Sequence, residues 1–206
     1  RIESMNQVFA LVRSYVLANA DNELGIFLFE RFHPSMPDAM KLELIEAISV
    51  TYPKRYTSLR KKALAGIEEK KRLDEQAKSV APGNKYKEIR CKGVDGEEIA
   101  LSDVAAKNRY VLLDFWATWC APCMGEVPHL IEVYKQFHDK GFEIYALSID
   151  DDSNAWRTTV KEKGMPWVNV LRKSPKVTEQ YGVRGVPSNF LIDCSTGKII
   201  AVHLRG

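Results

Sequence analysis

The first 80 residues follow a helical pattern of apolar and polar positions. Apolar side chains recur every three or four residues along one face, at Ile2, Met5, Val8, Val12, Tyr15 and Val16. This spacing is typical of an amphipathic helix whose apolar face packs against a partner. Asp21 is a suitable N-cap for a second short helix, and Ser35 with Pro37 indicates the start of a third, which Pro53 ends.

Residues 55–79 form a highly charged run in which acidic and basic side chains alternate three or four positions apart. Such pairs support a solvated helix. The mixed signs disfavour a nucleic-acid or membrane patch, which needs one sign of charge clustered on a face. We predict a connecting helix that ends at the turn-rich stretch 81–84. The boundary between a helical N-terminal segment, 1–80, and a second domain, 81–206, is placed there.

The second domain alternates strand-like and helical patterns. Residues 86–91 and 97–101 flank a glycine-containing turn as a hairpin, and 110–116 is a nearly continuous apolar run, as in a strand buried on both faces. Helical spacing over 126–138 is followed by a second buried run at 142–149. The order strand, helix, strand predicts an α/β domain.

The net charge and the length of the apolar runs argue against a nucleic-acid-binding or membrane-spanning protein. The net charge is only +3, from 30 basic and 27 acidic residues spread along the chain, so no nucleic-acid partner is expected. No apolar run approaches the roughly 20 residues that span a bilayer, so this chain is not expected to insert into a membrane. Because residue 1 is Arg rather than Met, we expect a processed form that lost its native N-terminus, with any signal peptide or lipid anchor.

The four cysteines are unevenly placed. Cys91 and Cys194 stand alone in strand-like alternation and are expected to be buried structural thiols. Cys120 and Cys123 form a C-x-x-C directly after the apolar run 110–116, at the start of a helix. Unpaired N–H groups and the positive dipole end there lower the pKa of a thiol and favour its nucleophilic thiolate.

The two cysteines of this motif are close enough along one helical turn to form a disulfide. Cys120, at the outer edge of the turn, is expected to attack, and Cys123, deeper in the helix, to resolve the mixed disulfide. Zinc is the alternative, but it takes four ligands, and the chain adds only His129 and His138, which do not have the spacing of an H-x₃₋₅-H pair. We therefore predict redox chemistry with no metal and no cofactor.

Two carboxylates near the motif are candidates for proton transfer. Asp114 interrupts the apolar run, where ionisation is costly, so its pKa is expected to be raised and its side chain to accept a proton from Cys123. Glu126, one helical turn after Cys123, is a second acid-base candidate, although an exposed helix Glu is common. Both residues are predicted to be catalytic.

Aromatic residues and a proline complete the candidate site. Trp116, Trp119 and Trp156 are expected mainly to pack, although Trp119, beside Cys120, can be partly exposed and contact the substrate. Pro187 precedes a strand-like run. Its spacing alone gives only the general rate of about 5% for a cis X-Pro bond.

The motifs resemble a known family. Residues 111–123, VLLDFWATWCAPC, resemble the active-site strand and helix of thioredoxin. Further segments resemble the TlpA/ResA-type extracytoplasmic branch, namely 95–103 (DGEEIALSD), 126–128 (EVP) and 185–193 (GVPSNFLID). The resemblance covers residues 81–206.

This resemblance implies a thioredoxin-like fold, a central mixed sheet flanked by helices. It implies that Cys120 is the exposed nucleophile, Cys123 the resolving thiol and Pro187 a cis-proline that contacts the substrate backbone, with Val186 able to pair with an extended segment. Glu126 falls where the branch has its active-site Glu. Asp114 falls where thioredoxins have their buried Asp.

The chain also departs from the family pattern. Thioredoxin-like domains normally end with a helix, whereas this sequence stops at Gly206 after the last predicted strand, so an apolar face is expected to need another cover. The helical segment 1–80 is similar to the extra region ahead of the redox domain in envelope proteins of Bacteroides-type bacteria.

The sequence thus predicts a disulfide reductase that acts on protein thiols and disulfides in the periplasm or cell envelope and receives electrons from an upstream donor. Ala121 and Pro122 place no charge beside Cys120, whereas strong oxidants need extra stabilisation of the thiolate. The alternative is a binding or scaffold protein whose helical segment recruits a partner. A peroxidase of the related peroxiredoxin type is a third possibility, but its Pro-x-x-x-Thr-x-x-Cys pattern is missing.

Overall fold

The computed structural model describes residues 2–204, with side chains from Met5 onward. The chain folds into two compact units, Arg1–Arg72 and Leu73–Gly206, which are described separately below. Among the described residues, no helix combines the length and the apolar content that a bilayer crossing demands.

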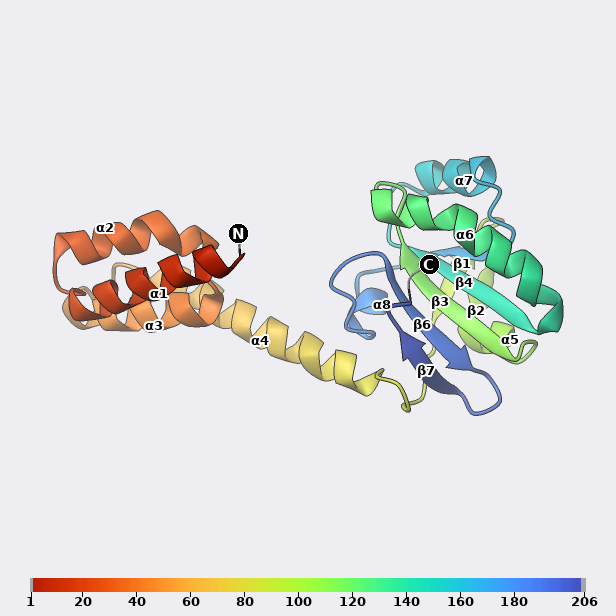
Figure 1. Ribbon diagram of the computed structural model, residues 1–206, viewed down its shortest axis with the longest axis horizontal. Helices are drawn as coiled ribbons and strands as arrows, with labels where there is room; N and C mark the ends of the chain where they lie inside the picture. Colours follow the sequence, from red (N-terminus) through yellow and green to blue (C-terminus); the bar gives the residue numbers. More distant parts are fainter. Residues whose placement is uncertain (1, 205–206) are drawn as a thin grey trace. The chain divides into compact units, whose positions relative to one another are not determined.

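The first unit is entirely helical (Figure 1). Its elements are α1 (Ile2–Ala18), α2 (Glu23–Phe32), a short 3-10 turn η1 (His33–Ser35), α3 (Asp38–Thr51) and the beginning of α4 (Thr57–Ser79). Most of its buried apolar side chains form one cluster, which contains Phe9, Val12, Val16, Ile26, Phe29, Met36, Leu44, Ile45 and Ile48. Apolar burial between the helices therefore holds this unit together.

Two details of the first unit differ from the prediction. The N-cap of α2 is Asn22 rather than Asp21, because the Asn22 side chain accepts the N–H of Gly25 at 3.0 Å. The buried face of α1 is centred on Phe9, Val12 and Val16, whereas Met5 is 42% exposed. The face of α1 that packs is therefore rotated slightly from the predicted apolar stripe.

The second unit is built on a seven-stranded mixed sheet with the order β2-β1-β5-β4-β3-β6-β7. The strands are β1 (Arg90–Gly93), β2 (Glu98–Ala100), β3 (Tyr110–Trp116), β4 (Phe142–Ser148), β5 (Val168–Leu171), β6 (Ser188–Asp193) and β7 (Lys198–Val202). The neighbouring pairs β3–β4 and β4–β5 are parallel, and the other pairs are antiparallel. The predicted mixed sheet is confirmed.

Helices cover both faces of this sheet. They are α5 (Leu101–Ala105), α6 (Ala121–Phe137) with the 3-10 turn η2 (His138–Lys140), α7 (Ser153–Glu162) and α8 (Lys176–Glu179). Helices α6 and α7 lie on the same face of the sheet (Figure 1). On β3, Val111, Leu113 and Phe115 pack on the face with α5. Leu112 and Trp116 pack on the face with α6 and α7. The strand is therefore buried on both faces, as its continuous apolar run predicts.

The hairpin begins later than the sequence pattern indicates. Residues 86–89 precede β1 without joining the ladder, and the phenol of Tyr181 binds both the N–H and the carbonyl of Lys87. A side chain from a distant segment thus satisfies backbone groups that a neighbouring strand would otherwise take. A contact between residues 94 positions apart cannot be predicted from the local pattern of apolar and polar residues.

Candidate active site

The paired cysteines lie at the connection between β3 and α6 and in the first turn of α6. The strand ends at Trp116, and a turn follows in which the N–H of Cys120 donates to the carbonyl of Ala117 at 3.1 Å. Helix α6 begins at the next residue, so Cys120 is its N-cap and Pro122 stands in the first helical turn. Proline is favoured there because its missing N–H has no partner to lose.

Cys120 and Cys123 form a disulfide, with an S–S distance of 2.04 Å and a Cα–Cα distance of 5.2 Å. The backbone N–H of Cys123 also donates to Sγ of Cys120, at 3.2 Å. A sulfur at this position faces the unpaired N–H groups and the positive end of the helix dipole. The arrangement favours negative charge on Cys120, as thiol-disulfide exchange requires of an attacking thiol.

The exposure of the two cysteines differs from the expectation. Each residue is only 4% exposed in the disulfide form, so Cys120 is not the more accessible of the two. The physical reason is the N-cap geometry, which folds the Cys120 side chain back over the first turn of α6. Trp119, by contrast, is 67% exposed and forms the apolar surface beside the disulfide.

Asp114 lies on the face of β3 that α6 covers, the face of its neighbours in alternation, Leu112 and Trp116. The residue is 7% exposed, and it lines a small cavity together with Cys123. The cavity holds about 10 Å³, and its remaining walls are Trp116, Val127, Leu130, Ala146, Met165 and Trp167. The structure therefore brings a buried carboxyl and the second cysteine of the motif to the lining of one small cavity.

Glu126 occupies a neighbouring hollow rather than this cavity. It is half-buried on α6 and lines a more open depression of about 250 Å³ with His129, Leu191 and other apolar residues. Leu130 lines both spaces, so the cavity of Asp114 and the hollow of Glu126 adjoin. The carboxyl of Asp114, on β3, and that of Glu126, on α6, thus line two adjacent spaces that share Leu130.

Pro187 lies at the same edge of the sheet as the disulfide. The peptide bond between Val186 and Pro187 is cis, as the family resemblance implies. Ser188, the next residue, pairs with Phe115 near the carboxyl end of β3, so the segment before β6 runs beside the turn that delivers Cys120. Val186 packs against the cores on both faces of the sheet.

The remaining tryptophans and cysteines have mainly packing roles. Trp116 and Trp156 are 3% and 1% exposed, as predicted. Cys91 is fully buried, but Cys194 follows the end of β6 and is only half-buried. Burial raises the pKa of the Cys91 thiol, and it raises that of Cys194 to about 11. Neither thiol has the electrostatic setting of a nucleophile.

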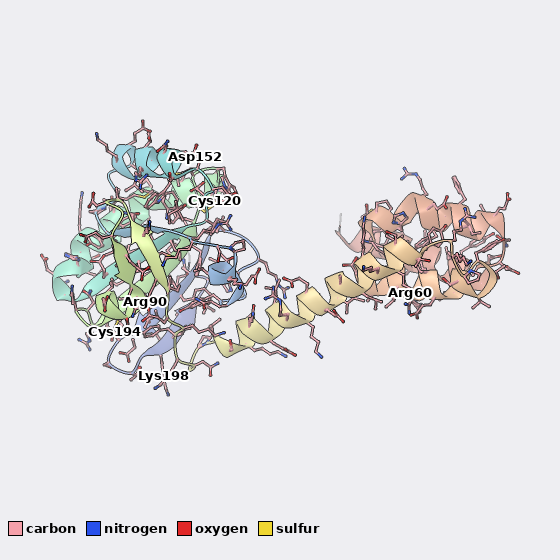
Figure 2. The ribbon with its side chains drawn as sticks, turned by 180° about the vertical axis from the view of Figure 1, so that it is seen from behind. Arg60, Arg90, Cys120, Asp152, Cys194 and Lys198 are labelled. Carbon is pink, nitrogen blue, oxygen red and sulfur yellow. A yellow bond between two sulfur atoms is a disulfide. The ribbon has the colours of Figure 1, made fainter. Side chains whose placement is uncertain are left out.

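Asp150, which was not predicted as a site residue, is 5% exposed and accepts hydrogen bonds from Thr118 in the turn before Cys120. Its position after β4 could have indicated that it lies at this edge of the sheet, where the carboxyl ends of parallel strands meet, but not that it binds Thr118. Figure 2 shows Cys120 and Asp152 at one end of the second unit, with Cys194 and Lys198 at the other.

Among the residues with described positions, no cluster of three or more His, Cys, Asp or Glu is arranged as metal ligands.

Comparison with known protein families shows that Cys120 and Cys123 lie in a domain that this chain shares with other proteins. The model of the AhpC/TSA family matches residues 82–202, which include both cysteines of the motif and Pro187. The thiol-disulfide oxidoreductase ResA of Bacillus anthracis is 37% identical over 107 residues, which are 52% of this chain and 60% of that protein. ResA of Bacillus subtilis is 33% identical over 124 residues, which are 60% of this chain and 68% of that protein. The match with the first of these relatives thus spans less than two thirds of its length.

Solved structures of similar proteins match about the same share of the chain. The thioredoxin domain of a thiol-disulfide oxidoreductase from Bacteroides vulgatus is 37% identical, with a TM-score of 0.58, over 62% of this chain and 91% of that structure. A thiol:disulfide interchange protein from Bacteroides sp. is also 37% identical, with a TM-score of 0.57, over 62% of this chain and 84% of its own. The predicted thioredoxin-like fold is therefore confirmed.

Proposed function

The chain belongs to the AhpC/TSA family, and from this premise we propose that it is a thiol-disulfide oxidoreductase that reduces disulfides in other proteins through Cys120 and Cys123. One observation carries the proposal. The two cysteines are joined at the start of α6, with Sγ of Cys120 held against the N–H of Cys123. This is the setting in which a thiol becomes a nucleophile and a disulfide can open and close without rebuilding the fold.

In the reductive reaction, the thiolate of Cys120 attacks one sulfur of the target disulfide. A bond forms between Cys120 and that sulfur, the target S–S bond breaks, and the second target sulfur leaves as a thiolate that takes up a proton. Cys123 then loses its proton and attacks Sγ of Cys120, which releases the first target sulfur as a thiol. Two electrons and two protons reach the target, and Cys120 and Cys123 end as a disulfide.

Proton transfer in the second half of this reaction is assigned to Asp114 and Glu126. Cys123 must lose a proton before it can attack, and Asp114 lines the same small cavity as Cys123. Glu126 lines the adjoining hollow, from which a proton can pass to solvent. We propose that Asp114 accepts the proton and that Glu126 assists its exchange with water.

The substrate is proposed to bind along the edge formed by Trp119, Val186 and Pro187. Trp119 offers an exposed aromatic surface beside Cys120. The segment of Val186 and Pro187 runs beside the disulfide at the start of β6, where its backbone can pair with an extended substrate segment. Backbone pairing aligns a target disulfide without demanding one particular sequence, so broad substrate tolerance is expected.

We further propose the arrangement of domains and the compartment. Residues 81–206 supply the redox domain, and residues 1–80 form a helical segment in front of it. The similarity of the redox domain to the extracytoplasmic TlpA/ResA branch supports a place in the periplasm or cell envelope. Regeneration of the dithiol needs an upstream dithiol donor, which gives up two electrons and two protons per cycle.

Reduction of insulin by dithiothreitol tests the proposal. The wild-type chain is expected to accelerate precipitation of the freed insulin B chain, and the Cys91→Ser variant, which alters a thiol away from the motif, is expected to match it. The double variant Cys120→Ser, Cys123→Ser should not accelerate it. A wild-type chain that gives no acceleration would instead support the binding or scaffold alternative.

A further inference from the structure

A buried carboxylate holds the turn that leads to Cys120. Asp150 follows β4 and is 5% exposed. Its Oδ1 accepts the hydroxyl of Thr118 at 2.7 Å, and its Oδ2 accepts the backbone N–H of Thr118 at 3.0 Å. Both hydrogen-bond donors of one turn residue are therefore taken by one carboxylate.

The carboxylate is itself held in place from β4. The hydroxyl of Ser148, a residue with no exposed surface, donates to Oδ2 of Asp150 at 2.6 Å, and the N–H of Asp150 donates to the Ser148 oxygen at 3.0 Å. Ser148 pairs with Trp116, the last residue of β3. These hydrogen bonds among Thr118, Ser148 and Asp150 are called the clamp below. The clamp joins the ends of two parallel strands at the point where the chain leaves β3.

The clamped residue lies inside the turn that sets the position of Cys120. The turn runs from Ala117 to Cys120 and is closed by the N–H of Cys120 on the carbonyl of Ala117. Thr118 is its second residue, and Trp119 is its third. Fixing the backbone N–H and the hydroxyl of Thr118 therefore fixes the direction in which the chain enters α6.

We propose that Asp150 is a positioning residue for the reaction of Cys120, because its hold on Thr118 keeps Sγ of Cys120 over the first turn of α6 when the disulfide is open. This proposal rests on the proposed function of the Cys120 and Cys123 pair and adds a residue to it. Asp150 acts through Thr118.

The clamp should favour the disulfide over the dithiol. In the disulfide form, the S–S bond itself holds Cys120 against Cys123, whereas in the dithiol form the turn depends on its hydrogen bonds. A turn that is already ordered raises the effective concentration of one thiol at the other, which favours ring closure. Loss of the clamp should therefore shift the equilibrium toward the dithiol.

The equilibrium with glutathione measures this effect. One oxidised glutathione takes two electrons and two protons from the protein dithiol and gives the protein disulfide and two molecules of reduced glutathione. The Thr118→Val variant keeps the shape and the backbone N–H of Thr118 but removes its hydroxyl. It is expected to lower the equilibrium constant for disulfide formation by up to about fivefold, the limit in which one hydrogen bond of typical strength stabilises the disulfide form alone. Asp150→Ala removes the whole clamp and should lower the constant further.

Two variants serve as controls. Thr118→Ser keeps the hydroxyl that Thr118→Val removes, so it should keep the wild-type equilibrium constant. Asp151→Asn changes a neighbouring carboxylate that is 94% exposed and paired with Arg172, so it removes one negative charge, as Asp150→Ala does, without touching the turn. It too should leave the constant unchanged. Urea unfolding of both redox forms separates positioning from stability, because a merely structural role weakens both forms equally and leaves their ratio intact.

The proposal is overturned if Thr118→Val and Asp150→Ala keep the wild-type equilibrium constant, or if Asp151→Asn shifts it as much as they do. Failure of the proposed function looks different, since the wild-type chain would then neither exchange with glutathione nor reduce insulin. The inference stands if the clamp variants shift the constant and the two controls do not.

Discussion

The backbone N–H of Cys123 points at Sγ of Cys120 from a distance of 3.2 Å. The first turn of α6 thus offers a hydrogen bond to the sulfur at its own N-cap, whereas Cys123 lies one turn deeper, against the cavity of Asp114. The two cysteines are equally buried, so this difference in hydrogen bonding, rather than exposure, distinguishes their chemistry.

The first prediction concerns the order of attack. The Cys123→Ser variant should trap mixed disulfides with target proteins through Cys120, because the resolving thiol is gone. The Cys120→Ser variant should trap few or none. Non-reducing gels of each variant, after incubation with a disulfide-bonded target such as insulin, make the comparison. Equal trapping by both variants would contradict the assignment.

A second prediction concerns proton transfer. The Asp114→Asn variant should slow the resolution of the mixed disulfide, because the proton of Cys123 loses its nearby acceptor, and it should shift the pH dependence of Cys123 alkylation. Glu126→Gln should shift it less. Alkylation rates measured against pH in a Cys120→Ser background test both. Glu132→Gln, which alters an exposed carboxylate on the same helix, is the control. Unchanged profiles in both test variants would remove these carboxyls from the mechanism.

The exposed ring of Trp119 gives a third prediction. Trp119→Ala should lower kcat/KM for insulin reduction by about tenfold, since a tryptophan at the centre of an interface commonly contributes on the order of 1–2 kcal/mol. Phe137→Ala removes an aromatic side chain that is 39% exposed at the far end of α6, and it should have little effect. A Trp119→Ala enzyme as active on insulin as the wild type would show that the ring does not contact the substrate.

The thiols outside the motif should react slowly. The pKa of Cys194 is raised to about 11 by burial, so at pH 8 only about one molecule in a thousand carries its thiolate. In the native dithiol form, iodoacetamide should therefore modify Cys120 first. Alkylation of Cys194 should rise with pH up to about 11, which peptide mass spectrometry can follow. Rapid modification of Cys194 at pH 8 would contradict this ordering.

A fifth prediction concerns the end of α4, whose last turns belong to the second unit. Gly182 has a φ of +61°, and a Cβ on it would lie 2.7 Å from the backbone nitrogen of Ala77. Gly182→Ala should lower the free energy of unfolding by about 2–4 kcal/mol, through both the positive φ and the clash. Gly164 has almost the same φ, +60°, with nothing near its Cβ position. Gly164→Ala should cost only about 1–2 kcal/mol. Urea unfolding compares the two, and equal losses would contradict the clash.

Much of the redox domain could be predicted from local sequence. The run 110–116 becomes β3, the C-x-x-C begins α6, and Asp114 lies under the helix because strand alternation places it on that face. These features depend on residues close together in the chain. The cis bond before Pro187 came from the family resemblance, since spacing alone gives no such indication.

Features that depend on distant segments could not be predicted. The interaction of Asp150 with Thr118 joins residues 32 positions apart, and the backbone groups of Lys87 are bound by the phenol of Tyr181, 94 positions away. The N-cap of α2 was assigned one residue early because Asp21 and Asn22 are both good caps, and only the geometry of the helix start separates them. The equal burial of Cys120 and Cys123 follows from the fold of the turn, which the motif does not encode.

The reduction potential of the Cys120 and Cys123 pair tests the central claim most directly. It is obtained from the fraction of protein disulfide at equilibrium with graded ratios of reduced and oxidised glutathione or dithiothreitol. A disulfide reductase requires a potential below about −200 mV, in the range of reducing members of the thioredoxin group. A potential near −120 mV, as in strong disulfide oxidants, would contradict the account, because the protein would then accept electrons from its targets rather than donate them.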